Sequence, residues 1–181
     1  MTPLGRVLKI IVLCAVALSG CGYSATRLLP ARYRTIHIQA FENHIAIAND
    51  ISDPSSFQTN LPGIEEKVTQ EVMNRFLFDG NLHVTNKPEE ADLILTGRLM
   101  EFLRQAVRRN DDGTPQEYRL NLVALMTLRE KDGTAVFEEE RVVGDATYFR
   151  TGSSARSETL AVTDLVTDFA RRVVGRVIEN W

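Results

Sequence analysis

Few side chains in this 181-residue sequence are spaced for catalysis or metal binding. No metal-ligand spacing connects the three histidines, which are His37, His44 and His83. The stretch TGSSARSE at 151–158 lacks the lysine of a phosphate loop, and no G-x-S-x-G nucleophile elbow occurs. The two cysteines, Cys14 and Cys21, lie within or just after the apolar N-terminal segment. We therefore expect neither an enzyme nor a metal protein, and the reactive group of interest is the Cys21 thiol.

The first twenty residues have the layout of a secretory signal. Arg6 and Lys9 make the segment basic, and the small residues Ser19 and Gly20 precede Cys21. The apolar run has only about a dozen residues, whereas a transmembrane helix needs roughly 20. We expect residues 1–20 to be removed on export.

The junction Leu-Ser-Gly-Cys at 18–21 resembles the cleavage box of bacterial lipoproteins, in which the cysteine is acylated and becomes the new N-terminus. Each buried methylene contributes about 0.8 kcal/mol, and stable anchoring takes more than one acyl chain, palmitate being one example. Gly22, rather than an aspartate, follows the cysteine, which favours the outer membrane. The alternative is an ordinary signal peptide in which Cys21 is an incidental thiol. No cofactor is expected beyond this covalent lipid.

The composition limits the number of domains, the partners and the disulfides that are possible in the mature chain. Loss of Arg6 and Lys9 with residues 1–20 changes the formal charge from −3 to −5 and leaves a length that suits one domain. An acidic balance argues against a nucleic-acid partner. With Cys14 removed and Cys21 acylated, no thiol remains for a disulfide. We expect a lipidated tether over 21–33 and a single folded domain over 34–181.

Alternating apolar residues and turn signals predict the strands. They are expected at 34–41, 81–85, 92–108, 116–130 and 135–150. Residues 42–60 are expected to form a long loop, in which 44–48 best suits a short strand. The turn sequences NDDGTP and KDGT join the last three strands into a meander.

Two amphipathic helices are expected at 62–79 and 154–180. In the first, Pro62 suits the first helical position, Asn60 or Thr59 can cap it, and Gly80 ends it. Its apolar stripe contains Ile64, Val68, Val72 and Phe76, widened by Leu61, Met73 and Leu77. The stripe of the second contains Leu160, Val162, Leu165, Val166, Phe169, Val173, Val174, Val177 and Ile178. The order β-α-β-β-β-β-α predicts an α+β two-layer sandwich, with both helices on one face of a mostly antiparallel sheet of four to five strands.

The sheet face without helices is the predicted partner surface. If Leu95, Leu99 and Leu103 face the helices, the residues that alternate with them along the strand face outward. The candidate partner-facing residues are Met100, Phe102, Arg119, Val123 and Leu125, and the candidate anion-binding residues are Arg98, Arg104, Arg108, Arg109 and Arg156. Arginine beside apolar side chains suits a phosphate-bearing amphipathic ligand or a protein partner. An ordinary solvated face would have the same pattern.

Several stretches in a fixed order resemble one family. They are CGY at the cysteine, LLP, TIHIQAFEN, ADLILTGRL, YRLNLVALMTLREKDGTAVFEE and the terminal VVGRVIENW. Together they resemble the LptE lipoproteins of Gram-negative bacteria over nearly the whole mature chain.

The resemblance implies an outer-membrane lipoprotein that plugs the lumen of the LptD β-barrel, supports assembly of that barrel and helps deliver lipopolysaccharide to the cell surface. It also implies lipopolysaccharide binding through basic residues near strand ends. The hairpin-tip position falls at Arg108 or Arg109, and a second position after the last strand falls near Arg156.

Two other function classes stay open at the level of sequence. A free-standing outer-membrane lipoprotein could bind and activate a periplasmic cell-wall enzyme through the same sheet face. A soluble lipid carrier would need a deep apolar cavity, and the apolar pattern indicates a filled core.

Overall fold

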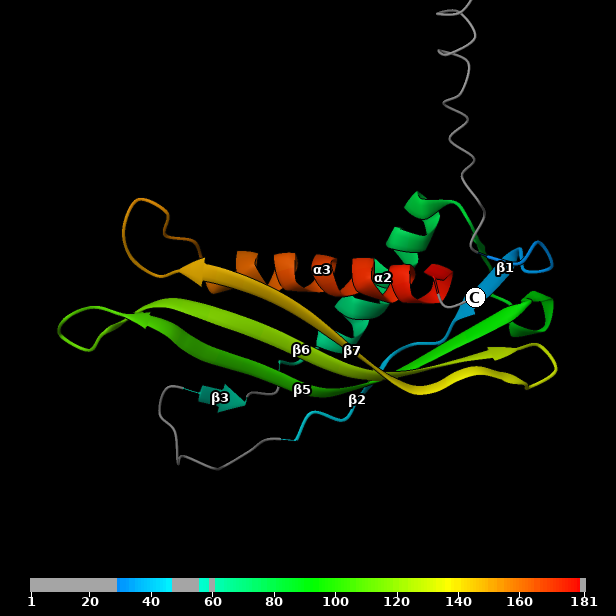
Figure 1. Ribbon diagram of the computed structural model, residues 1–181, viewed down its shortest axis with the longest axis horizontal. Helices are drawn as coiled ribbons and strands as arrows, with labels where there is room; N and C mark the ends of the chain where they lie inside the picture. Colours follow the sequence, from blue (N-terminus) through cyan, green and yellow to red (C-terminus); the bar gives the residue numbers. More distant parts are fainter. Residues whose placement is uncertain (1–28, 47–55, 59–60, 180–181) are drawn as a thin grey trace, which may run out of the picture.

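Three long strands form the centre of the fold in the computed structural model, which describes residues 29–46, 56–58 and 61–179 (Figure 1). They are β5 (Leu93–Arg109), β6 (Pro115–Glu130) and β7 (Ala135–Phe149). All three pair antiparallel in chain order, as their alternating sequences and tight turns predict. The meander is confirmed.

Short strands extend this sheet beyond β5. β1 (Thr35–Ile38) lies between β5 and β4 (His83–Val84) and is parallel to both, which gives the order β4-β1-β5-β6-β7. β2 (Glu42–Asn43) pairs parallel and β3 (Ser56–Gln58) antiparallel with β5. The segment 42–60 is therefore not only a loop, and its first strand precedes the predicted stretch 44–48, part of which lies outside the described residues.

Helices α2 (Ile64–Asp79) and α3 (Glu158–Glu179) cover one face of the sheet, so the two-layer α+β sandwich is confirmed. A short 3-10 turn, η1 (Pro88–Glu90), precedes β5. Helix α2 begins two residues after the predicted Pro62, because Gly63 takes a left-handed φ of 77° and separates the proline from the helix. The predicted caps Asn60 and Thr59 lie outside the described residues, and Gly80 ends the helix as expected.

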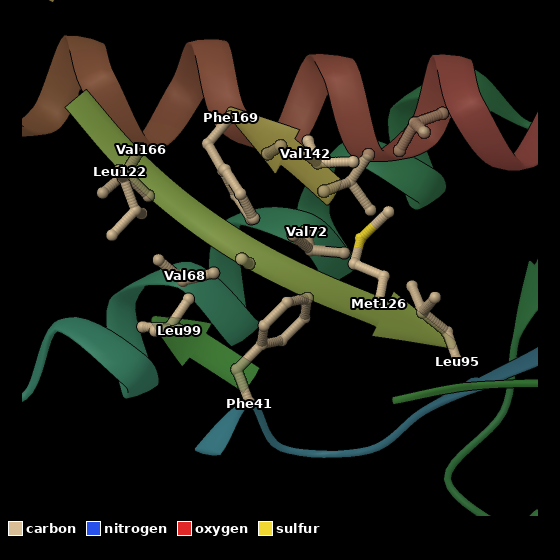
Figure 2. Close-up of a cluster of buried hydrophobic side chains, with 14 of the residues drawn as sticks. Phe41, Val68, Val72, Leu95, Leu99, Leu122, Met126, Val142, Val166 and Phe169 are labelled. Carbon is tan, nitrogen blue, oxygen red and sulfur yellow. The ribbon is translucent and has the colours of Figure 1, made fainter. Parts of the chain in front are cut away.

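The core lies between the sheet and the two helices (Figure 2). Phe41 and Phe169 meet edge to face with ring centroids 6.0 Å apart. Glycines make this approach possible: a Cβ on Gly144 would lie 2.6 Å from the Cβ of Phe169, and one on Gly97 would collide with the Phe41 ring. Phe41 itself reaches the core because β1 ends at Ile38, whereas a strand continued to residue 41 would have turned it outward.

The predicted helix stripes are largely buried, with two exceptions. Val68, Val72 and Phe76 are fully buried, whereas Leu77 is 64% exposed. Leu160, in the first turn of α3, is 52% exposed. Both therefore contribute apolar surface instead of core.

The folded body also includes part of the predicted tether. Leu29 and Tyr33 are buried in the core, and Tyr33 donates a 2.6 Å hydrogen bond to Glu130. The predicted signal peptide and Cys21 lie outside the described residues. In the part of the chain that the structure describes, neither helix has the length and apolar character to cross a bilayer.

Candidate functional site

A β-bulge in β5 changes which residues face outward. The pairing with β6 shifts register between Leu99 and Glu101, so one extra residue inverts the alternation from there to Ala106, after which the register shifts again. Phe102 is fully buried in the core, and Leu103 is not among the core residues. The prediction that Phe102 and Arg104 face away from the helices is therefore wrong, because it assumed a strand without a bulge.

Arg104 instead lies where the sheet meets the start of α3. Its Nη1 donates a 2.8 Å hydrogen bond to Glu158, the first residue of that helix, which also accepts one of 3.1 Å from the Tyr148 hydroxyl. The guanidinium lies 5.3 Å from the centre of the Tyr118 ring, which stacks on Tyr148 at 5.5 Å. We call Arg104, Tyr118, Tyr148 and Glu158 the tyrosine latch. It fixes the N-terminus of α3 to β5, β6 and β7.

Burial and charge in the tyrosine latch act on its titratable groups. Burial, together with the negative charge of Glu158, raises the pKa of Tyr148 to about 12, so this phenol stays protonated. Burial alone would lower the pKa of Arg104, but the attraction of the Glu158 carboxylate outweighs this effect and raises the pKa. The latch therefore holds one fixed ion pair over the physiological pH range.

Three of the predicted anion-binding arginines, Arg108, Arg109 and Arg156, lie at one end of the sheet, whereas Arg98 and Arg104 lie elsewhere. We call this end the hairpin end; it comprises the β5–β6 turn 110–114, its flanking strand residues and the loop 150–157. Arg108 pairs with Glu117 of β6, and Glu117 pairs with Phe149 of β7. The backbone N–H of Arg156 donates a 2.8 Å hydrogen bond to the carbonyl of Phe149. The β5–β6 turn and the loop after β7 therefore lie at the same end of the sheet (Figure 1).

The arginine side chains at the hairpin end are exposed, and they differ in how closely an acidic partner neutralises them. Arg108 lies 3.9 Å from Glu117 with 62% of its side chain exposed. Arg109 donates a 2.9 Å hydrogen bond to the carbonyl of Gly113, and Arg156 pairs with Asp164 at 2.7 Å. Arg150 is exposed and donates through its backbone to Gln116. Each of these exposed guanidinium groups is accessible from solvent and is therefore a candidate contact for an anionic ligand.

The outer face of the sheet is more polar and more neutral than predicted. Arg98 pairs with Glu139, Arg129 pairs with Glu138, and the shallow groove between them has a volume of about 490 Å³. Met100 and Leu125 are half-buried, Arg119 is exposed, and Val123 is only 6% exposed. Val123 lies between Glu101 and Val143 on the neighbouring strands, so it offers little surface to a partner.

Metal chemistry has no support in the described ranges. No group of three or more histidine, cysteine, aspartate or glutamate side chains within them could hold a metal ion. The ring of His37 lies 3.0 Å from the backbone carbonyl of Thr85, and that of His44 lies 2.8 Å from Glu42.

Comparison with known proteins places the chain in a family. The family model described as "LptE: Lipopolysaccharide-assembly" matches residues 33–177, which is most of the chain. The chain belongs to the LptE family. Its family function is thus lipopolysaccharide assembly, and the resemblance of the quoted stretches is confirmed. No curated protein matches the sequence of this LptE family member.

Solved structures share the fold. One is the solution structure of uncharacterized lipoprotein B from Nitrosomonas europaea, with a TM-score of 0.55 and 12% identity over 88% of this chain and 90% of that one. Another is the hypothetical protein CT253 from Chlamydia trachomatis, with a TM-score of 0.52 and 10% identity over 80% and 95% of the two chains. At such identities the likeness concerns the fold alone.

Sequence reasoning missed the tyrosine latch. Arg104 was predicted only as an anion-binding residue, and Tyr118, Tyr148 and Glu158 had no motif. The stacking and the ion pair depend on strand register, because Tyr118 and Tyr148 are direct partners across β6 and β7.

Proposed function

We propose that this LptE family member is a lipid-anchored, non-enzymatic part of the outer-membrane lipopolysaccharide translocon. In this proposal it plugs an LptD-type β-barrel, aids assembly of that barrel and binds lipopolysaccharide. The observation that carries the proposal is the family match over 33–177, which covers nearly all of the described fold.

The hairpin end supports the lipopolysaccharide part of the proposal. Arg108, Arg109 and Arg156 are exposed there on a rigid sheet end that the tyrosine latch holds to α3. Lipopolysaccharide carries phosphate groups, and arginine binds phosphate through two parallel hydrogen bonds. Arg104, by contrast, is engaged in the latch, so its contribution to binding is indirect.

The charged outer surface supports the proposal that the protein plugs a β-barrel. Lumens of large outer-membrane barrels are polar, so a plug with charged sides fits them better than an apolar one. The outer face offers such a surface, since Arg98, Arg129 and their glutamate partners lie along it. Acylation of Cys21 would keep the protein at the membrane that holds the barrel.

Copurification from native membranes tests the proposal. Detergent-solubilised protein, tagged at its C-terminus, is expected to copurify with a large outer-membrane β-barrel and with lipopolysaccharide, and mass spectrometry is expected to find acyl chains on Cys21. Isolation with a peptidoglycan synthase, without a barrel, would instead support the enzyme-activating lipoprotein. If mass spectrometry finds no acyl group on Cys21, the protein is not lipid-anchored and that part of the proposal is wrong.

A further inference from the structure

A second cluster of arginines lies at the opposite end of the fold, where α2 and α3 finish. A groove of about 600 Å³ between α2, α3 and β7 is lined by five arginines, Arg75, Arg141, Arg171, Arg172 and Arg176. We call it the arginine groove. Its two acidic lining residues are Asp79 and Glu179, so the lining itself carries an excess of positive charge.

Not all of these arginines have acidic partners. Arg172 pairs with Asp145 and Asp168, and Arg176 pairs with Glu140. Arg75 and Arg141 form no ion pair with any residue of the described ranges. The Nε of Arg75 is also buried from solvent without a hydrogen-bond acceptor in that part of the chain. A buried donor of this kind costs free energy unless a ligand satisfies it.

An exposed apolar pair adjoins the groove. Phe78 is 81% exposed and Leu77 is 64% exposed, and they are neighbours in the last turn of α2. The guanidinium of Arg75 lies 5.3 Å from the centre of the Phe78 ring, which connects the apolar pair to the groove. Exposed aromatic and aliphatic side chains beside arginines are typical of surfaces that enter the interface of a bilayer.

The chain path brings this surface close to the anchor of the proposed function. Leu29, the first described residue, lies eight positions after Cys21, so an extended chain spans at most about 29 Å between them. β1 follows six positions later, and its first residue, Thr35, pairs with His83 of β4. Helix α2 ends at Asp79, four positions before His83. Figure 1 shows the C-terminal ends of α2 and α3 on the same side of the molecule as β1.

We propose that Phe78, Leu77 and the arginine groove form a membrane-docking surface that rests on the phospholipid headgroups of the bilayer holding the anchor. The inference rests on the proposed acylation of Cys21, which keeps this end near the bilayer. Phe78 and Leu77 enter the headgroup region, and Arg75 and Arg141 bind lipid phosphates. The hairpin end then points away from the anchoring leaflet, with its own arginines presented to a different ligand.

Site-directed fluorescence tests this orientation. The mature lipoprotein has no free thiol if Cys21 is acylated, so Phe78→Cys introduces a single labelling site. Leu160→Cys is the matched control, because Leu160 is also an exposed apolar residue but lies at the start of α3. Each full-length acylated variant is labelled with the same fluorophore and reconstituted into vesicles of phosphatidylethanolamine and phosphatidylglycerol.

A lipid-borne quencher near the headgroups is expected to quench the label at 78 roughly threefold more than the label at 160, since interfacial groups enter only the outer layer of the bilayer. Adding Arg75→Glu and Arg141→Glu to Phe78→Cys is expected to reduce this quenching to the level of the control. Equal quenching at 78 and 160, with acyl chains on Cys21 confirmed by mass spectrometry, would overturn the inference alone. Absence of the acyl chains would overturn the anchor and the inference together.

Discussion

The two ends of the sheet present arginine in different settings. At the hairpin end, Arg108 and Arg109 are the last two residues of β5, and the Nε of Arg108 lies 3.9 Å from Glu117. At the other end, Arg171 and Arg172 share Asp168 on α3, and only Arg75 and Arg141 lack ion pairs within the described residues. A similar number of arginines is thus exposed at one end, where they are candidate ligand contacts, whereas at the other end most of them pair with acidic residues of α3 and β7. Counting charges in the sequence does not separate these roles.

Removing charge at each end should therefore affect different measurements. Arg108→Ala with Arg109→Ala is expected to weaken lipopolysaccharide binding about a hundredfold, because each lost charge-assisted hydrogen bond is worth roughly 1.5 kcal/mol. Arg171→Ala with Arg176→Ala is the matched control, since Arg171 and Arg108 are equally exposed. Binding of purified protein to immobilised lipopolysaccharide at moderate salt is the measurement. Equal losses in both variants would show that binding follows overall charge instead of the hairpin end.

The tyrosine latch should give the largest effect on stability. Arg104→Met is expected to lower the free energy of unfolding by about 1–2 kcal/mol, because it leaves Glu158 and the Tyr148 hydroxyl without their cation in a partly buried position. Urea unfolding measures this loss. The control is Arg129→Met at the exposed pair with Glu138, which should cost far less. Similar costs for the two variants would mean that the latch is no stronger than a surface ion pair.

Asp168 makes the opposite end sensitive to acid. Burial alone would raise the pKa of Asp168, but hydrogen bonds from Arg171, the backbone N–H of Asp145 and Arg172 outweigh it and lower the pKa. A lowered pKa in the folded state means that the carboxylate stabilises the fold above its unfolded pKa, near 3.9, and that this contribution is lost as the pH falls through the folded value.

Asp168→Asn is accordingly expected to lower the free energy of unfolding by about 1 kcal/mol at pH 7. The difference from the native protein should begin to shrink as the pH falls below about 4, where the unfolded carboxyl is protonated, and should vanish only below the lower folded pKa of Asp168. Thermal unfolding between pH 3 and pH 7 is the measurement. A difference that stays constant over this range would contradict the assignment of the effect to ionisation.

The smallest effect is expected on the outer face. Arg98→Ala removes an exposed pair with Glu139 and should change the free energy of unfolding by less than about 0.5 kcal/mol. Its lipopolysaccharide affinity should be measured beside that of the hairpin-end variant. A loss as large as that of Arg108→Ala with Arg109→Ala would extend the binding site from the hairpin end onto the outer face.

Much of the fold could be predicted from local pattern. Ile64, Val68, Val72 and Phe76 recur at helical spacing, and the structure buries all four in one stripe. The meander followed from alternation and from the Asp132-Gly133 turn, both of which act over a few residues. Phe102 marks the limit of such reasoning. The bulge after Leu99 adds one residue without a sequence signature and reverses the faces of β5 as far as Ala106, where the register shifts again.

The sequence by itself determined the three long strands, the two helices, the two-layer class and the family, because these depend on residue periodicity and on motifs in a fixed order. It also identified Arg108, Arg109 and Arg156 as candidate residues, although their role in binding stays a prediction. Only the tertiary structure brought Arg108 and Arg156 to one end of the sheet, joined Arg104 to Glu158 and set Arg75 beside Phe78. Those arrangements depend on strand register and helix packing between distant segments, which local pattern does not encode.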